Sequence, residues 1–175
     1  MVETMTWPSD DVLLDLLNST PIVGGVAQDL LADPAEARDW LRQRGGDGSP
    51  EERDAVRQVR DTLQGVVRGD RPVSDLAPFL EGATYRPAVS KRGVEWSLDA
   101  PPGRATSVRV LLAWDALERT RPGRLRPCAN TECGLFLLDR SKTNRARWCS
   151  MAVCGNRMKA RRHYQRTQRP PAGAC

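Results

Sequence analysis

The chain has 175 residues, of which 39% are hydrophobic and 28% charged, a composition that supports a folded core and excludes a disordered or fibrous protein. No apolar run approaches the roughly 20 residues of a membrane span, and the acidic start is not followed by the apolar run of a secretory signal, so we expect a cytoplasmic protein without a membrane partner. The net charge of +5 is unevenly divided: residues 123–175 hold 12 Lys and Arg against two acids, which leaves −5 on residues 1–122.

The first 70 residues predict three helices. The first begins at Ser9, a capping residue, carries leucines and a valine at helical spacing, and ends before Pro21. Segments 33–36 and 49–52 each place a cap, a proline at the first helical position and a glutamate three residues after the cap. These two starts predict a short second helix and a longer third helix that ends at Gly69.

The period of the apolar residues changes after a further short helix predicted at residues 74–80. Apolar residues alternate over 85–89 and again over 94–98, with a turn between them, which predicts a two-stranded hairpin. A last helix of this part begins near Ser107 and stops at residues 121–123, where the sequence changes character.

Four cysteines follow in two pairs, each C-x4-C, with 15 residues between the pairs. They are Cys128, Cys133, Cys149 and Cys154. Zinc prefers four tetrahedral ligands, and thiolates suit a structural site. Disulfides do not fit a reducing compartment, and the polar surroundings do not fit buried free thiols, whereas an iron–sulfur cluster uses the same ligand type. We favour one structural zinc ion, with His163 and Cys175 outside the site.

Few large apolar residues surround these cysteines, so the metal is expected to hold the module together, at a contribution on the order of 10–16 kcal/mol. Phe136 and Leu138 predict a strand with its buried face inward. A turn at 139–141 then predicts a short polar helix that ends near Trp148.

A basic helix is predicted from Asn156, its cap, to the proline at position 170. Four cations share one face of it, and the opposite face, which includes His163 and is mostly uncharged, is expected to pack on the module. No acidic residue lies between Gly155 and Arg169, which favours a nucleic-acid-binding helix over a merely solvated one. The candidate contacts are Arg145, Arg147, Asn156, Arg157, Lys159, Arg161, Arg162, Arg166 and Arg169.

Three partners for the basic helix remain open at this point. Duplex DNA is favoured, because one helix fits the major groove and cations along it reach phosphates on both sides. Trp148 and Tyr164 could instead stack on the bases of RNA or a single strand. An acidic protein could also dock on the helix.

The body offers one cluster of small polar groups, Asn18, Ser19 and Thr20, at the end of the first helix. It is a candidate site for a small-molecule effector, or a helix stop whose side chains satisfy backbone groups. A homodimer is a further expectation for such a body. We predict no enzymatic activity, because the chain has no Ser/His/Asp arrangement and all four metal ligands come from the protein.

We therefore predict an α+β fold with three parts. Residues 1–122 form a mostly helical N-terminal domain with a β-hairpin, which senses an effector or dimerises. Residues 123–169 form a small four-cysteine zinc module that ends in the basic helix, and residues 170–175 form a flexible tail.

Residues 125–166 resemble the CGNR zinc finger of bacterial regulators, named for the sequence found here at Cys154–Arg157. The match covers both cysteine pairs, the segment around Asp139 and the basic helix. The body is similar to the stress-induced transcription regulator domain, or ABATE domain, through LLDLLNSTP, the Trp-Leu pair at 40–41 and RDAVRQVRDTL. The resemblance implies four-cysteine zinc binding and a role in transcription. It leaves two roles for Arg157, an internal anchor to Asp139 or a contact to DNA.

Overall fold

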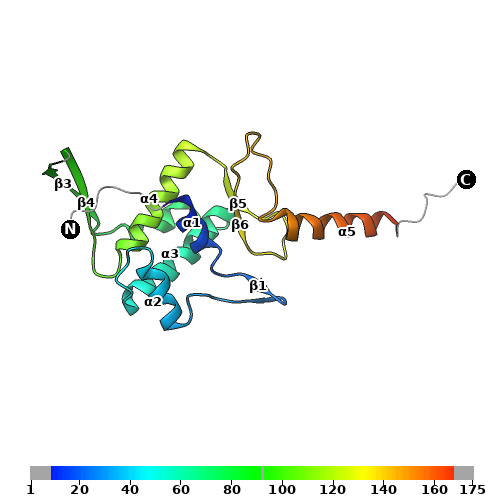
Figure 1. Ribbon diagram of the computed structural model, residues 1–175, viewed down its shortest axis with the longest axis horizontal. Coiled ribbons are helices and arrows are strands. Elements are labelled where there is room, and N and C mark those ends of the chain that lie inside the picture. The colour runs from blue at the N-terminus through cyan, green and yellow to red at the C-terminus, as the bar shows by residue number, and fades with distance from the viewer. Residues whose placement is uncertain (1–8, 92, 168–175) are drawn as a thin grey trace, which may run out of the picture.

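The computed structural model describes residues 9–91 and 93–167, and within them the chain forms a group of helices and three small two-stranded antiparallel sheets (Figure 1). The helices are α1 (Asp10–Leu17), α2 (Pro34–Arg42), α3 (Pro50–Arg68), the 3-10 helix η1 (Val73–Phe79), α4 (Ala105–Thr120), the π-helical turn η2 (Met151–Gly155) and α5 (Asn156–Thr167). The strands pair as β1 (Ile22–Val23) with β2 (Val26–Ala27), β3 (Thr84–Ser90) with β4 (Gly93–Asp99), and β5 (Leu125–Pro127) with β6 (Phe136–Leu138). The predicted fold class is confirmed.

The outline of the molecule is elongated, with the β3–β4 hairpin and α5 at opposite ends of its long axis (Figure 1). Within the described residues, no helix combines the length and the apolar content needed to cross a membrane. Arg92 in the hairpin turn, Arg169 and the predicted tail at 170–175 lie outside the described residues.

The helices of the body begin where the capping residues predict. The Asp33 carboxylate accepts hydrogen bonds from the backbone N–H groups of Ala35 and Glu36, and the Ser49 hydroxyl accepts one from the N–H of Glu52 at 3.1 Å. These bonds satisfy N–H groups that have no partner within the helix. The third predicted helix ends at Gly69 in the left-handed conformation, with φ of 85°, which glycine adopts without steric cost.

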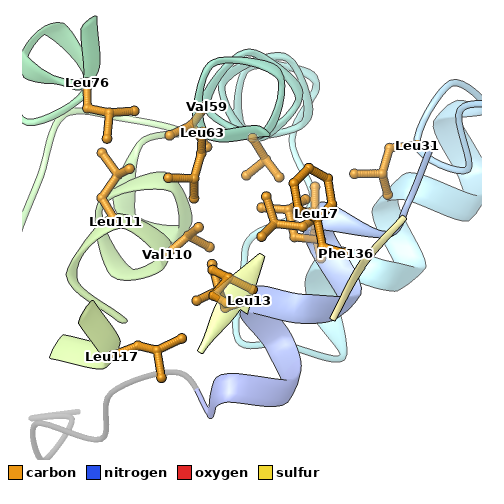
Figure 2. Packing of buried hydrophobic residues seen from close by; sticks show 14 of the residues in the cluster. Leu13, Leu17, Leu31, Val59, Leu63, Leu76, Val110, Leu111, Leu117 and Phe136 are labelled. Atoms are coloured by element: carbon orange, nitrogen blue, oxygen red, sulfur yellow. The ribbon is translucent and has the colours of Figure 1, made fainter. Parts of the chain in front are cut away.

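The hydrophobic core lies between α1, α3 and α4 (Figure 2). Leu13, Leu16 and Leu17 of α1 are completely buried, and each such leucine contributes roughly 1.5–3 kcal/mol through its burial. Phe136, from the β6 strand beyond the predicted boundary, is only 1% exposed and belongs to the same cluster. The division into a body at 1–122 and a finger at 123–169 stays a prediction, since one core spans it.

A buried arginine ties the loop after β2 to α3. Arg60 is 2% exposed, and its guanidinium donates to both carboxylate oxygens of Asp29, to Asp61 and to the hydroxyl of Ser19. Burial acts to raise the pKa of Asp29, but hydrogen bonds from Arg60, from the Leu31 N–H and from a second arginine outweigh it and lower the pKa to about 2. The charge of Arg60 is therefore compensated inside the body.

Two parts of the fold differ from the prediction. The β1–β2 hairpin around Gly24 and Gly25 was not predicted, and its strands have only two residues each. The polar helix predicted between residue 139 and Trp148 is wrong: this segment forms an irregular loop. Its backbone N–H groups bond to a buried carboxylate described below, which competes with helix formation.

Candidate metal centre and nucleic-acid interface

The first cysteine pair lies in the connection between β5 and β6. Cys128 directly follows β5, and its N–H donates to the carbonyl of Leu135 at 2.8 Å, while the N–H of Cys133 donates to the carbonyl of Asn130 at 2.9 Å. These two bonds close residues 128–135 into a tight loop. The hairpin thus places the first two thiols on the same side of the chain.

The second cysteine pair is carried by the turn that leads into α5. The N–H of Cys149 lies 3.5 Å from the Sγ of Cys128, and Cys154 sits within η2, 1% exposed. Gly155 is closely packed: a Cβ here would lie 2.8 Å from the end of the Met151 side chain and 3.3 Å from the side chain of Trp148. The close packing of this turn brings the second pair against the first.

The four sulfur atoms lie within 4.8 Å of one another. Cys133 and Cys149 are 3.5 Å apart at Sγ, and Cys149 and Cys154 are 3.7 Å apart. Zinc bonded to thiolates at about 2.3 Å in a tetrahedron separates the sulfurs by about 3.8 Å, whereas a disulfide brings them to about 2.05 Å. The sulfur positions fit one tetrahedral zinc ion.

The surroundings of two of these sulfurs disfavour the thiolate form in the absence of a cation. Burial raises the pKa of the Cys149 and Cys133 thiols, and neighbouring sulfurs raise the pKa of Cys149 further. A divalent cation reverses this effect, because it stabilises the thiolate form. The side-chain amide of Asn130, a residue 2% exposed, lies 3.6 Å from the Sγ of Cys154 and orients that sulfur.

The loop between β6 and the second cysteine pair is built around the buried carboxylate of Asp139. It accepts hydrogen bonds from the N–H groups of Ser141 at 2.9 Å and Ala146 at 2.7 Å, and pairs with Arg126 at 2.6 Å. A hydrogen bond from the Ser141 side chain lowers the pKa of Asp139 most, and the two N–H groups and Arg126 lower it further, so that it falls to about 2 although burial acts to raise it. Arg126 also donates to the backbone and side-chain oxygens of Asn144, which has a left-handed φ of 49°. The Asp139–Arg126 pair is a structural feature that the sequence analysis did not identify.

The alternative internal role for Arg157 does not agree with this arrangement. Asp139 pairs with Arg126, and within the described residues the exposed side chain of Arg157 forms neither an ion pair nor a hydrogen bond. The structure therefore leaves Arg157 directed to solvent at the start of α5.

Helix α5 projects away from the rest of the molecule (Figure 1). Met158 is half-buried, and every other residue of the helix is exposed, His163 included. The expectation that its uncharged face packs on the module is wrong, because η2 holds the helix only at its beginning. Asn156 is not the cap either: it has helical φ and ψ, and the Ser150 side chain accepts from the N–H of Val153 instead.

The predicted nucleic-acid contacts among the described residues lie on α5 and on the segment before Cys149, and most of their cations have no carboxylate partner there; Arg169 lies outside the described residues. From Lys142 to Arg166, the described part of the chain shows one ion pair of a basic side chain, Arg161 with Glu132 at 2.9 Å. Arg145 has no polar partner among the described residues, and Arg147 lies over the ring of Trp148 at 5.4 Å.

The candidate effector cluster is engaged within the protein. Asn18 bonds to Phe136 in both directions: its Oδ1 accepts from the N–H at 2.7 Å and its Nδ2 donates to the carbonyl at 3.2 Å. Ser19 accepts from Arg60, and Thr20 accepts from Gln64. The three residues thus link α1 to β6 and α3, and an effector role for them stays a prediction.

Two family models match the chain. The model described as "Putative stress-induced transcription regulator" (ABATE) matches residues 10–122. The model of the CGNR zinc finger matches residues 124–167, which contain all four cysteines and the whole of α5. No match to a curated protein accompanies these two matches. The resemblance noted from the sequence is confirmed, and the four cysteines constitute the zinc site of a CGNR zinc finger.

Proposed function

We propose, for a chain that belongs to the ABATE family and carries a CGNR zinc finger, that it is a zinc-dependent transcription regulator whose finger binds duplex DNA. Both matched families are of regulatory or zinc-finger type and neither is a family of enzymes. The body is then the regulatory part, which senses an effector or forms a homodimer.

One observation carries the proposal: α5 is an exposed helix with five cations and no acid. The cations are Arg157, Lys159, Arg161, Arg162 and Arg166. A charged helix on the surface of an ordinary protein intersperses acids, which pair with its cations at i,i+4 spacing. Because α5 has none, its charge is available to a polyanion.

The shape of α5 suits a duplex. Its 12 residues extend about 18 Å, and its exposed sides are free to enter a major groove about 12 Å wide. An isolated helix of this length is only marginally stable in water, so contact with phosphates on both sides of a groove would also stabilise it. Arginines near its start could read guanine through bidentate hydrogen bonds.

The aromatic residues support duplex binding over binding to single strands. Trp148 is half-buried and lies beside Gly155 and under Arg147, so its ring is not presented to a base. Tyr164, 63% exposed, is a lone aromatic on α5. Single-strand binders stack several successive bases on several aromatics, which this surface does not offer.

A link between the body and the finger supports a regulatory role for the body. Both hydrogen bonds of the Asn18 side chain go to the backbone of Phe136, three residues beyond the zinc ligand Cys133. A displacement of the end of α1, by an effector or a second subunit, would therefore be transmitted to the strand that supports the metal site.

The proposal is tested by competition. The zinc-loaded full chain is bound to a fluorescent 30-base-pair duplex, and unlabelled duplex, single-stranded DNA and a structured RNA compete for it. We expect duplex to compete best, and the triple variant Lys159→Glu, Arg162→Glu, Arg166→Glu to lose binding. The double variant Arg38→Glu, Arg42→Glu on α2 is the control and should bind like the wild type. Stronger competition by RNA or by a single strand would refute the duplex assignment. If the chain does not bind duplex but retains an acidic protein after nuclease treatment, protein binding replaces DNA binding as the function.

A further inference from the structure

A second basic feature lies on the finger apart from α5. It is an open hollow of about 580 Å³ lined by Arg126, Pro127, Ala129, Arg145, Ala146 and Arg147. Three of its six lining residues are arginines, and no carboxylate lines it. We refer to it as the arginine hollow.

Backbone hydrogen bonds hold the segment that carries two of the three arginines. The N–H of Ala129 donates to the carbonyl of Arg147 at 2.8 Å, and the N–H of Ala146 donates to Asp139 at 2.7 Å, so the loop segment with Arg145 and Arg147 is held at two points. Both arginines line the hollow and both are exposed. The segment therefore places two arginines at one hollow.

Hydrogen bonds to residues of the protein hold the third arginine. Arg126 makes its hydrogen bonds to Asp139 and Asn144 through Nη2 alone, and its Nε is buried with no hydrogen-bond partner in the described part of the chain. The side chain is 32% exposed, whereas that of Asp139 is completely buried. The carboxylate thus fixes the guanidinium from the protein side and leaves positive charge on the side of the hollow.

Three guanidinium groups gathered at one hollow recognise an anion with several oxygens. A planar guanidinium matches the geometry of phosphate through two parallel hydrogen bonds. Arg126 is already held by Asp139 and Asn144, so little of its conformational entropy is lost when the anion arrives. The chemistry of the hollow is therefore that of a phosphate site.

From this we infer that the arginine hollow binds a backbone phosphate of the nucleic acid that α5 engages, an inference that rests on the proposed function. The hollow is open to solvent, so it holds a free ion weakly. A polymer already bound to α5 presents its phosphates at a high effective concentration. The finger then binds the duplex at two places: α5 lies in the groove, and the hollow contacts the phosphate backbone.

The test uses the salt dependence of duplex affinity. The dissociation constant of the zinc-loaded full chain is measured for a duplex of random sequence at several salt concentrations between 50 and 200 mM. The logarithm of affinity falls with the logarithm of salt by about 0.9 for each phosphate neutralised. The double variant Arg145→Ala, Arg147→Ala should therefore have a slope shallower by about 0.9, which makes the loss of affinity over this range about threefold smaller than in the wild type.

Two further variants separate charge from structure. Arg145→Ala alone removes an exposed side chain without a polar partner in the described residues, so it leaves the fold intact and should still reduce the slope. Arg145→Lys, Arg147→Lys keeps both charges and should restore most of it. The matched control is Arg119→Ala, Arg121→Ala, which removes two exposed body arginines at the same spacing, and it should keep the wild-type slope.

The outcomes distinguish the inference from the proposed function. If the wild type has a steep slope and both alanine variants retain it, the inference that the hollow binds phosphate is wrong, but the proposed function is not affected. A wild type without salt-dependent duplex binding overturns the proposed function itself. Direct titration with inorganic phosphate is the last arm: tight binding of the free ion by the wild type, lost in the double variant while both proteins keep the same duplex slope, would make the hollow a free-phosphate site and overturn its assignment to the nucleic-acid backbone.

Discussion

The body and the finger use arginine in opposite ways. In the body, Arg44, Arg53, Arg57, Arg60, Arg71, Arg86, Arg119 and Arg121 each pair with a carboxylate. In the finger, Arg126 pairs with Asp139 and Arg140 with Asp11, but from Lys142 to Arg166 the described residues include one such pair, at Arg161. Much of the arginine charge of the body is thus compensated within the chain, whereas most of the cations after residue 141 have no carboxylate partner among the described residues.

The two regions also differ in what holds them together. The body buries leucines and valines of α1, α3 and α4 around one core. The finger contributes Leu125 and Phe136 to that core, and the rest of it is organised by four sulfurs and by the buried Asp139. The base of the exposed helix α5 lies at the four sulfurs, where a bound zinc ion would hold it in a region with so small a core of its own.

Loss of the metal should have the largest effect on the difference in stability between the two regions. Cys128→Ser removes one of four zinc ligands and should abolish tight zinc binding, at a cost on the order of 10 kcal/mol to the finger. The body should remain helical through its own leucines, but at reduced stability, because Leu125 and Phe136 of the finger belong to its core. Elemental analysis gives the zinc content, and circular dichroism with limited proteolysis shows which region has unfolded.

The control for zinc content is Cys175→Ser, at a cysteine that lies outside the described residues, and it should leave the zinc content unchanged. A Cys128→Ser protein that retains one zinc per chain would contradict the ligand assignment.

Phe136→Ala should show that the two regions share a core. The side chain is 1% exposed and packs against the body, so its truncation should destabilise the body by about 3–5 kcal/mol. Chemical denaturation followed by the helical signal measures the effect. Val153→Ala, at a finger residue 54% exposed, is the comparison and should cost less than about 1 kcal/mol. Equal stability of the two variants would mean that the finger does not support the body.

The ion pairs of Asp29 should make the stability of the body sensitive to acid. The pKa of Asp29 is about 2 in the folded protein and 3.8 in the reference state, so the folded state favours the ionised form. This preference contributes about 2 kcal/mol to the free energy of unfolding. The contribution is present above pH 4 and is lost as the pH falls through 2. Denaturation of the wild type and of Asp29→Asn as a function of pH should show a stability difference that shrinks between pH 4 and pH 2. A difference independent of pH would rule this contribution out.

The smallest effect is expected at the link between the regions. Asn18→Ala removes both side-chain hydrogen bonds to Phe136 and should cost about 1–2 kcal/mol. The informative measurement is hydrogen exchange at β6, which should become faster while exchange in α3 stays unchanged. Faster exchange in both elements would assign Asn18 to the body core alone.

Local sequence signals predicted the elements whose causes are local. The caps at Asp33 and Ser49, the glycine stop at Gly69 and the alternation of the hairpin each act through neighbours in the chain, and each led to the observed element. The zinc site was predicted for a similar reason, because the spacing of two cysteine pairs is itself the constraint that the metal imposes.

The features that were not predicted depend on contacts across the chain. The local sequence of the loop after β6 predicts a polar helix. The structure has a loop instead, because Asp139 binds the N–H groups of Ser141 and Ala146 and the side chain of Arg126. Helical periodicity placed the uncharged residues of α5 on one face, but it carries no information on whether another element covers that face. The burial of Phe136 in the body core likewise depends on how β6 meets α1.

The salt dependence of duplex affinity for the wild-type chain tests the central claim most directly, since unpaired cations must release counterions from DNA. The account predicts that affinity for a random duplex falls by at least about tenfold between 50 and 200 mM salt, as expected for two or more neutralised phosphates. Equal affinity at the two salt concentrations would contradict the claim that the finger presents its uncompensated charge to DNA.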